Sequence, residues 1–243
     1  MSTRTIAAPD SREFWRDALA RSGGTTIRRW ALDPVPGTAE QEVPIPDAHV
    51  VATRRLAREL AVPLHAVLLG AHARVLRALS GEREVVTGYL VGGRPLPCRL
   101  TTDAASWRNL VRTTHRVEAQ LRAHSAFPVD DLRRETGLSG PAFETVFDPA
   151  GEFGDLPAVA VLGIGVVQRD GRYLLRMPYR TDALDAGCAA GIAGYHLAAL
   201  ALIAADPDAL HRWQALPSAQ ERPDRRAREP SGQRVTLHRD AVA

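Results

Sequence analysis

The feature that most constrains the fold is a pair of neighbouring apolar segments. The first has the spacing of a helix, and the second has the pattern of a strand that is apolar on both faces. Residues 64–79 carry apolar side chains at helical spacing, and Gly81 closes this segment. Residues 84–90 then form an apolar run without polar alternation, which is typical of a strand buried on both faces. These two segments predict a helix followed closely by an internal strand.

Capping residues and turn residues mark the other predicted elements. Asp10 with Glu13 resembles a capping box, Asp47 can cap a second helix, and Ser106 can cap a long amphipathic helix. Asp170-Gly171 suits a hairpin turn between the last two strands. Further helices are predicted at 10–22, 48–60, 106–121, 128–135 and 184–204, and further strands at 42–46 (an edge strand), 99–101, 143–147, 159–168 and 173–179.

The composition excludes several functional classes. All 31 basic residues are Arg, which excludes a Schiff-base lysine and a P-loop lysine, and the net charge of +3 is no nucleic-acid signature. Cys98 and Cys188 are too few for a disulfide framework or a zinc site. The first ten residues lack a signal core, and the apolar stretch 183–205 indicates a packed helix, so we expect a cytoplasmic protein without a membrane or nucleic-acid partner.

Several short motifs occur along the chain in one order. The apolar run 64–76 leads to Val-Val-Thr-Gly at 85–88 and Gly-Gly-Arg at 92–94. It is followed by Leu-Pro-Cys-Arg-Leu at 96–100, His-Ser-Ala-Phe-Pro-Val at 124–129, Pro-Ala-Phe-Glu-Thr-Val-Phe at 141–147, Tyr-Arg-Thr-Asp-Ala-Leu-Asp at 179–185 and Leu-Pro-Ser-Ala-Gln-Glu-Arg at 216–222. Together these motifs resemble the carboxyl-terminal lobe of a nonribosomal peptide synthetase condensation domain.

The resemblance implies an α/β fold with a mixed sheet flanked by helices, a single lobe of the chloramphenicol-acetyltransferase-like architecture. This lobe is expected over residues 10–216, with a flexible segment at 1–9 and a disordered Arg-rich tail at 217–243. The family joins an acyl or peptidyl donor to an amine acceptor, both carried on pantetheine arms of carrier proteins. Its catalytic motif, His-His-x-x-x-Asp-Gly, belongs to the amino-terminal lobe, and no two of the eight histidines here are adjacent.

Two segments depart from the family pattern by being short. Only Pro95-Leu96-Pro97 separates Arg94, which closes a strand in the family, from Cys98. The second segment, after the strand at 143–147, is a short loop at 149–154. In the family the corresponding segments reach across to the first lobe and floor the substrate tunnel. Their shortening is expected for a chain with no first lobe to bridge.

The histidines offer few catalytic candidates. We expect no catalytic residue, and His124 remains as the candidate for a general base, although no acid stands where the family would orient it. No other histidine has an orienting acid in evident reach. His65 and His72, seven apart on one helix face, are predicted to be core or interface residues and not a metal pair. His115 and His196 are placed on helices, His196 beside Tyr195 in a buried, hydrogen-bonded position, and His49 and His211 are placed at the surface.

A glycine pair imitates a cofactor motif. Gly163-Ile164-Gly165 resembles the start of a dinucleotide fingerprint, but Gln168 replaces its third glycine and no helix follows. A strand with two glycines where another group packs closely is the simpler interpretation.

These observations predict a half-size condensation-like protein of nonribosomal peptide biosynthesis, a form of secondary metabolism that includes antibiotic biosynthesis. It is expected to be non-catalytic and to bind a carrier protein, a tailoring enzyme, a separate amino-terminal lobe or itself. One alternative is half of a split enzyme that forms amide or ester bonds once a partner supplies the catalytic lobe, and another is an inactive gene remnant. No cofactor or metal is expected, although phosphopantetheine could arrive on a carrier protein, which the Arg-rich tail could dock.

Overall fold

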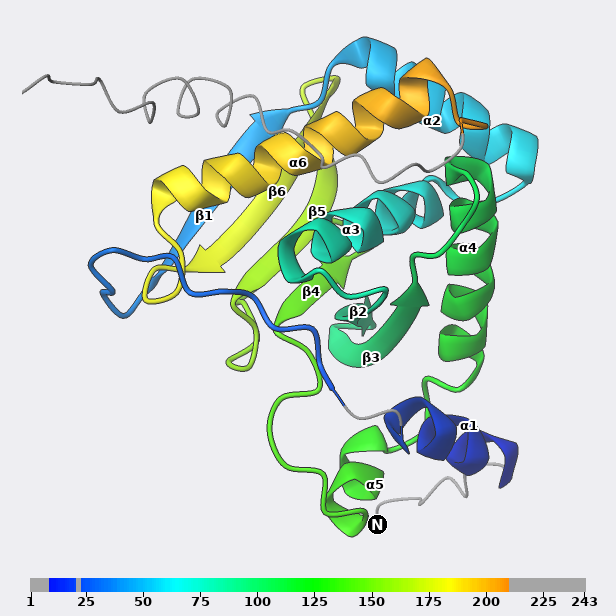
Figure 1. The fold of residues 1–243 in the computed structure, drawn as a ribbon, viewed down its shortest axis with the longest axis vertical. Helices are drawn as coiled ribbons and strands as arrows, with labels where there is room; N and C mark the ends of the chain where they lie inside the picture. Colours follow the sequence, from blue (N-terminus) through cyan, green and yellow to red (C-terminus); the bar gives the residue numbers. More distant parts are fainter. Residues whose placement is uncertain (1–8, 21–22, 210–243) are drawn as a thin grey trace, which may run out of the picture.

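A mixed six-stranded sheet organises the chain (Figure 1). The computed structural model describes residues 9–20 and 23–209. The strand order is β1-β6-β5-β4-β2-β3, in which β2, β4 and β5 run parallel and the remaining pairs are antiparallel. The strands are β1 (Thr38–Pro44), β2 (Glu84–Val91), β3 (Arg94–Thr101), β4 (Thr145–Asp148), β5 (Leu162–Arg169) and β6 (Arg172–Arg180). The helices are α1 (Pro9–Ala20), α2 (Asp47–Leu60), α3 (Leu64–Ser80), α4 (Trp107–Ala123), α5 (Val129–Glu135) and α6 (Ala186–Ala205).

This arrangement confirms the predicted α/β fold with a mixed sheet flanked by helices. The strand after the apolar helix is internal, with residues 85–89 buried, as its lack of polar alternation indicated. The boundary predicted at residue 216 and the Arg-rich tail lie outside the described residues.

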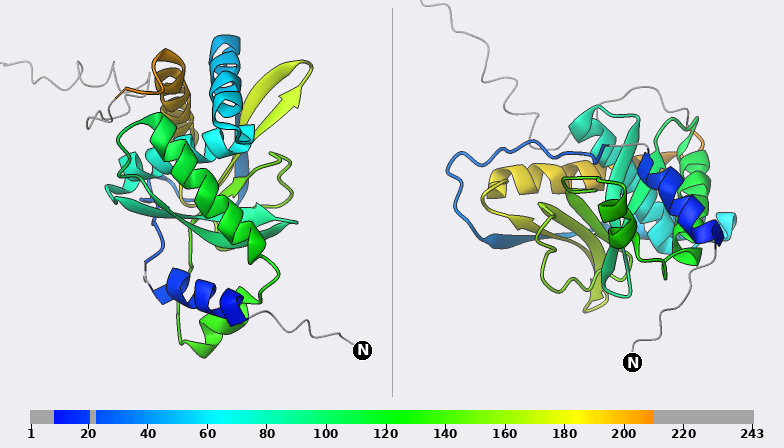
Figure 2. Two further views of the ribbon diagram at one scale, coloured as in Figure 1. Left: turned by 90° about the vertical axis from the view of Figure 1, so that its right-hand side faces the viewer. Right: turned by 90° about the horizontal axis from the view of Figure 1, so that it is seen from below.

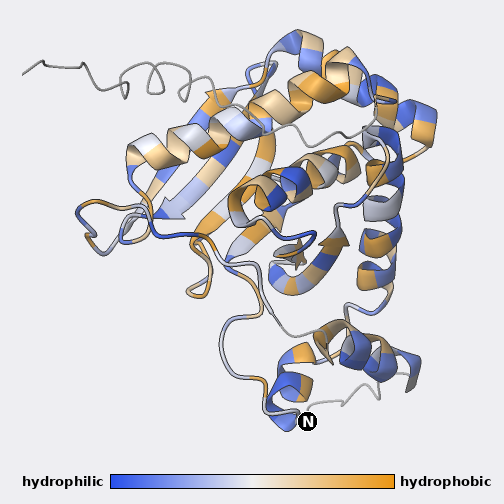
Figure 3. Cartoon of the chain, viewed as in Figure 1, coloured by the Kyte–Doolittle hydropathy of each residue, from blue (hydrophilic) through white to orange (hydrophobic). Residues whose placement is uncertain are grey.

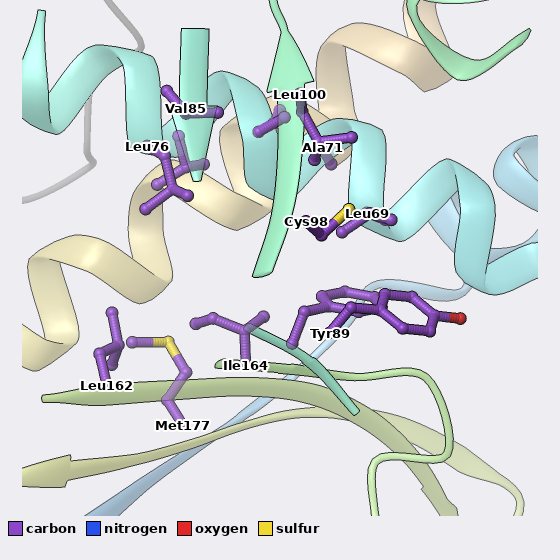
Figure 4. Packing of buried hydrophobic residues seen from close by; sticks show 14 of the residues in the cluster. Leu69, Ala71, Leu76, Val85, Tyr89, Cys98, Leu100, Leu162, Ile164 and Met177 are labelled. Atoms are coloured by element: carbon purple, nitrogen blue, oxygen red, sulfur yellow. The ribbon is translucent and has the colours of Figure 1, made fainter. Parts of the chain in front are cut away.

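The main core lies between the sheet and a layer formed by α2, α3, α4 and α6. Figure 4 shows Leu69, Ala71 and Leu76 of α3 packed above side chains of the sheet. Tyr89 of β2 and Met177 of β6 line the core on the side of the sheet, and both are fully buried. Burial of so many large apolar side chains is the dominant stabilising term for a domain of this size.

Helix α6 is one of the elements of this layer. Its second half is strongly apolar (Figure 3), and within the described residues it is the single helix long and apolar enough to cross a membrane by length and composition. It packs on α2 and α3, with Ile192, Leu200 and Ile203 buried, which confirms the predicted packed helix.

Aromatic rings cover the other face of the sheet, and glycines in the strands make room for them. A Cβ atom at Gly88 would lie 2.6 Å from the ring of Phe143. The loop after β4 folds back over its own sheet and lays Phe153 across β5, where a Cβ at Gly163 or Gly165 would meet the ring at 3.0 or 2.9 Å. The prediction of close packing at this glycine pair is therefore confirmed.

Strand β3 is longer than predicted, because the proline segment forms part of it. Gly92 and Gly93, with φ of 58° and 79°, make a two-residue hairpin, so Arg94 opens β3 and does not close the strand before it. Pro95 and Pro97 are two apart and share one side of the backbone. Their nitrogens cannot donate to β2, so an intact ladder requires them on the outer edge, where no N–H is needed.

Other element ends differ from the predictions by a few residues. Asp47 is not the cap of α2, because Pro46 holds that position and no side-chain cap bond forms. The cap at Ser106 is confirmed, since its Oγ accepts a hydrogen bond from the backbone N–H of Asn109. The edge strand β1 begins at Thr38 and ends at Pro44, earlier than predicted, because it follows β6 along most of that strand.

Candidate functional site at the carboxyl edge of the sheet

A pocket of about 550 Å³ lies at the carboxyl ends of β2 and β4. Its walls are the hairpin at 90–93, the loop at 148–157 and Arg122 of α4. Carboxyl ends of neighbouring parallel strands gather at one edge of a sheet, which is where α/β folds place their ligand sites. Of the two short segments noted in the sequence, the loop at 149–154 lines this pocket, whereas Pro95-Leu96-Pro97 lies in β3 outside the lining.

A buried carboxylate stands beside this pocket. The side chain of Glu118 in α4 is 3% exposed, and its Oε1 lies 2.7 Å from Nε2 of His65 and accepts a 2.7 Å hydrogen bond from the hydroxyl of Tyr89. Its other oxygen lies 3.6 Å from Nδ1 of His115. Arg122, which lines the pocket, approaches the same carboxylate at 3.5 Å.

These contacts keep Glu118 ionised. Burial raises the pKa of a carboxyl group, but the hydrogen bonds from His65 and Tyr89 outweigh burial here and lower the pKa of Glu118 to about 2. Burial and the bond to Glu118 together raise the pKa of the Tyr89 hydroxyl, so it remains a hydrogen-bond donor. The ionised carboxylate fixes the orientation of the imidazole of His65, whose side chain is 23% exposed.

The expectation that no other histidine has an orienting acid is wrong for His65. Glu118 lies 53 residues further along the chain, so sequence proximity gave no signal. A signal did exist in the helix pattern: Glu118 falls on the apolar face of α4 between Thr114 and Leu121, where an acid must find donors.

His124 lies at the carboxyl end of α4, where it joins α1 to the rest of the molecule. Its Nδ1 lies 2.9 Å from Oγ of Ser11, its ring stacks on Phe14 at 4.4 Å, and its carbonyl oxygen accepts a bond from the indole N–H of Trp15. No carboxylate contact is found for it in the described part of the chain. Through these contacts His124 holds α1 against α4, and it does not line the pocket.

His72 and His196 form a pair in the core. Nδ1 of His72 lies 3.2 Å from Nε2 of His196, and Thr87 and the carbonyl of Ile192 complete the network at 3.3 and 2.9 Å. Burial lowers the pKa of His72 far below its usual range and lowers the pKa of His196 to about 4. Both predictions are confirmed: His72 is a core histidine, and His196 is buried and hydrogen-bonded.

The remaining predicted residues supply no second site. His65 and His72 contact different helices, α4 and α6 respectively. His115 is partly exposed on α4, His49 is half-buried on α2, and His211 lies outside the described residues. Burial raises the pKa of Cys98 to about 12 and raises that of the half-buried Cys188, so both stay thiols. Within residues 9–20 and 23–209, no group of three His, Cys, Asp or Glu is placed to hold a metal ion.

Comparisons with known proteins show which proteins this chain is similar to. No family model matches the chain. It is 32% identical over 144 residues to the AMB antimetabolite synthetase AmbE of Pseudomonas aeruginosa, and 26% identical over 215 residues to the nonribosomal peptide synthetase fso1 of Omphalotus olearius. These matches span 50% and 76% of this chain but only 6% and 5% of those much longer proteins.

The solved structures agree with the sequence matches. The first condensation domain of the CDA synthetase superposes with a TM-score of 0.69 at 19% identity, covering 85% of this chain and 53% of that one. The X-domain from teicoplanin biosynthesis gives 0.70 at 17% identity, with 85% and 57% covered. The chain therefore has the fold of a condensation domain over little more than half of such a domain. This confirms the predicted resemblance to one lobe of a nonribosomal peptide synthetase condensation domain.

Proposed function

We propose that this lobe serves nonribosomal peptide biosynthesis in the cytoplasm by binding a protein partner at the carboxyl-edge pocket, and that its own residues do not form peptide bonds. The observation that carries the proposal is the pocket itself. It is built in part from the loop at 149–154, one of the two segments that, by the family resemblance, reach the opposite lobe, and here this loop is short and lies against its own sheet. The other short segment, at 95–97, belongs to β3 and does not line the pocket.

The side chains around the pocket suit binding more than catalysis. Leu90, Val91 and Phe153 give it apolar walls, while Arg122 and the acids Asp148, Glu152 and Asp155 supply charge at its borders. Such walls with a few polar groups are typical of binding sites. The 243 residues contain no adjacent histidine pair, so the family's base is not among them.

The partner is proposed to be a carrier protein, a tailoring enzyme or a separate amino-terminal lobe. The X-domain from teicoplanin biosynthesis, which shares this fold, has been solved in complex with OxyB. That complex supports a recruiting role for a condensation-like lobe. Phosphopantetheine would then be present on the carrier protein and not as a cofactor of this chain.

An acyl-transfer assay tests the non-catalytic part of the proposal. The purified chain is mixed with carrier-bound acyl thioesters and an amine acceptor, and amide formation is followed by mass spectrometry. No turnover above the uncatalysed rate is expected. Robust turnover would overturn the proposal, and comparison of His65→Ala with His124→Ala would then locate the responsible side chain.

A pair of matched variants tests the binding part. Ala150→Arg places a long cation in the pocket wall, whereas Ala158→Arg places the same side chain in the same loop outside the pocket lining. Affinity for holo carrier proteins of nonribosomal peptide synthetases or for separately expressed condensation lobes is measured by calorimetry. We expect Ala150→Arg to weaken binding by about tenfold or more and Ala158→Arg to change it less than about twofold. Equal losses in both variants would refute the pocket as the binding site.

A split enzyme is the second candidate, and the ordered His65–Glu118 pair beside the pocket favours it. A separately expressed lobe that carries His-His-x-x-x-Asp-Gly is added to the chain. Amide formation only in the mixture would replace the non-catalytic proposal with the split enzyme. Absence of both binding and activity would favour an inactive remnant.

A further inference from the structure

The outer face of α4 carries a row of arginines and no acidic side chain of the helix itself. Arg108, Arg112 and Arg116 follow one another at i, i+4 spacing, so they form a stripe along one side of the helix. The single acid of the helix, Glu118, points inward and is 3% exposed. Figure 2 (left) shows α4 crossing the front of the molecule with no other described element over it.

This stripe lowers the stability of the helix that carries it. Like charges at i, i+4 repel each other, and Arg108 lies in the first turn, at the positive end of the helix dipole. Arg108 is compensated by Glu59 at 3.0 Å and Asp208 at 2.8 Å. Arg112 and Arg116 make no ion pair with the described residues. Both residues are exposed, and Arg112 makes only a small contribution, after that of Arg108, to lowering the pKa of Asp208.

We propose that the stripe of Arg108, Arg112 and Arg116 is a docking surface for a protein partner with an acidic face. Its length of about 12 Å along the helix matches two turns of an acidic helix or a compact acidic patch. A continuous phosphate backbone would run past Arg108 into Glu59 and Asp208, whereas a compact acidic patch can contact Arg112 and Arg116 alone, so a nucleic acid is disfavoured. None of the three arginines lines the carboxyl-edge pocket, so this surface is separate from the one in the proposed function.

A single substitution separates binding from stability. Arg112→Glu puts an acid between two arginines, so both repulsive i, i+4 pairs become attractive. We expect the melting temperature of the full chain to rise by about 2 °C. Binding to short poly-L-glutamate, measured by fluorescence anisotropy at low salt, is expected to weaken by about fivefold or more. Arg28→Glu makes the same change of charge at an exposed position far from α4 along the chain and should leave the affinity within about twofold.

Three results would overturn the proposal. Equal weakening by Arg112→Glu and Arg28→Glu would mean that net charge and not this face attracts the probe. Unchanged affinity in Arg112→Glu would exclude the stripe directly. Tighter binding of single-stranded oligothymidylate than of poly-L-glutamate at equal charge, lost in Arg112→Glu, would assign the face to nucleic acid. A melting temperature at or above that of the unsubstituted chain shows that any loss of affinity does not come from unfolding.

Discussion

Glu118 is the residue around which the polar part of this lobe is arranged. Its carboxylate receives Tyr89 from β2 and His65 from α3, so one side chain ties two elements to α4. A buried carboxylate is stable only when its oxygens find donors, and each donor here would be left unpaired without it.

Removal of this carboxylate should therefore cost stability. We expect Glu118→Leu to lower the free energy of unfolding by about 2–3 kcal/mol, because the Tyr89 hydroxyl and the His65 ring nitrogen lose their acceptor. Tyr89→Phe removes one bond and no acceptor, and should cost about 1 kcal/mol. Urea denaturation measures both, and a Glu118→Leu loss no larger than that of Tyr89→Phe would contradict this account.

At the residue scale, the sequence predicted which histidines are buried better than it predicted which side chains they contact. The core placement of His72 and His196 followed from their apolar neighbours on helices. The pairing of His65 with Glu118 did not, because it depends on how α3 crosses α4, and helix packing angles are set by the whole set of contacting side chains.

Among the elements, strand β3 shows how local preference and tertiary context compete. Two prolines in three residues argue against a strand, so the sequence predicted only residues 99–101. The segment is nevertheless extended, because the Gly92-Gly93 turn aligns it with β2 and the prolines fall on the edge side. Helix starts were predicted well where a side-chain cap exists, as at Ser106, and less well at Asp47, which is the first residue of α2 and follows Pro46 at the cap position.

The fit of Phe143 over Gly88 gives a prediction at the scale of the sheet. Gly88→Ala should lower the free energy of unfolding by about 2 kcal/mol, because the added methyl group overlaps the ring. Phe143→Leu removes the overlapping ring atoms and should itself cost about 1 kcal/mol.

A double-mutant cycle measures this coupling. In the Phe143→Leu background, Gly88→Ala is expected to cost less than about 1 kcal/mol, since space has been opened for the methyl group. Additive losses in the double variant would show that the methyl group is excluded by the backbone and not by the ring.

For the molecule as a whole, the buried histidine pair sets a pH dependence of stability. The pKa values of His72 and His196 are lowered in the folded state, to about 4 for His196, from an ordinary value of 6.5. Between these pH values the two histidines are protonated in the unfolded chain and neutral in the folded chain. Stability contributed by the pair is therefore complete above pH 6.5 and is lost as the pH falls toward 4, by about 1.4 kcal/mol per pH unit for each histidine.

Urea denaturation between pH 7 and pH 5 measures this slope. Glu118, whose pKa is lowered from 4.5, loses its contribution only below that range, so the histidines dominate it. His196→Gln should reduce the slope by about half, because one of the two titrating groups is gone. An unchanged slope in this variant would assign the acid sensitivity to other groups.

The prolines at the outer edge of β3 limit how this molecule can meet other chains. A free strand edge normally offers N–H groups that a second chain can use to extend the sheet, which is a common route to aggregation. Pro95 and Pro97 remove two of these donors side by side, so strand addition is blocked along the half of β3 next to the hairpin. A second chain that associates across that half of the edge must therefore use side-chain contacts in place of backbone hydrogen bonds.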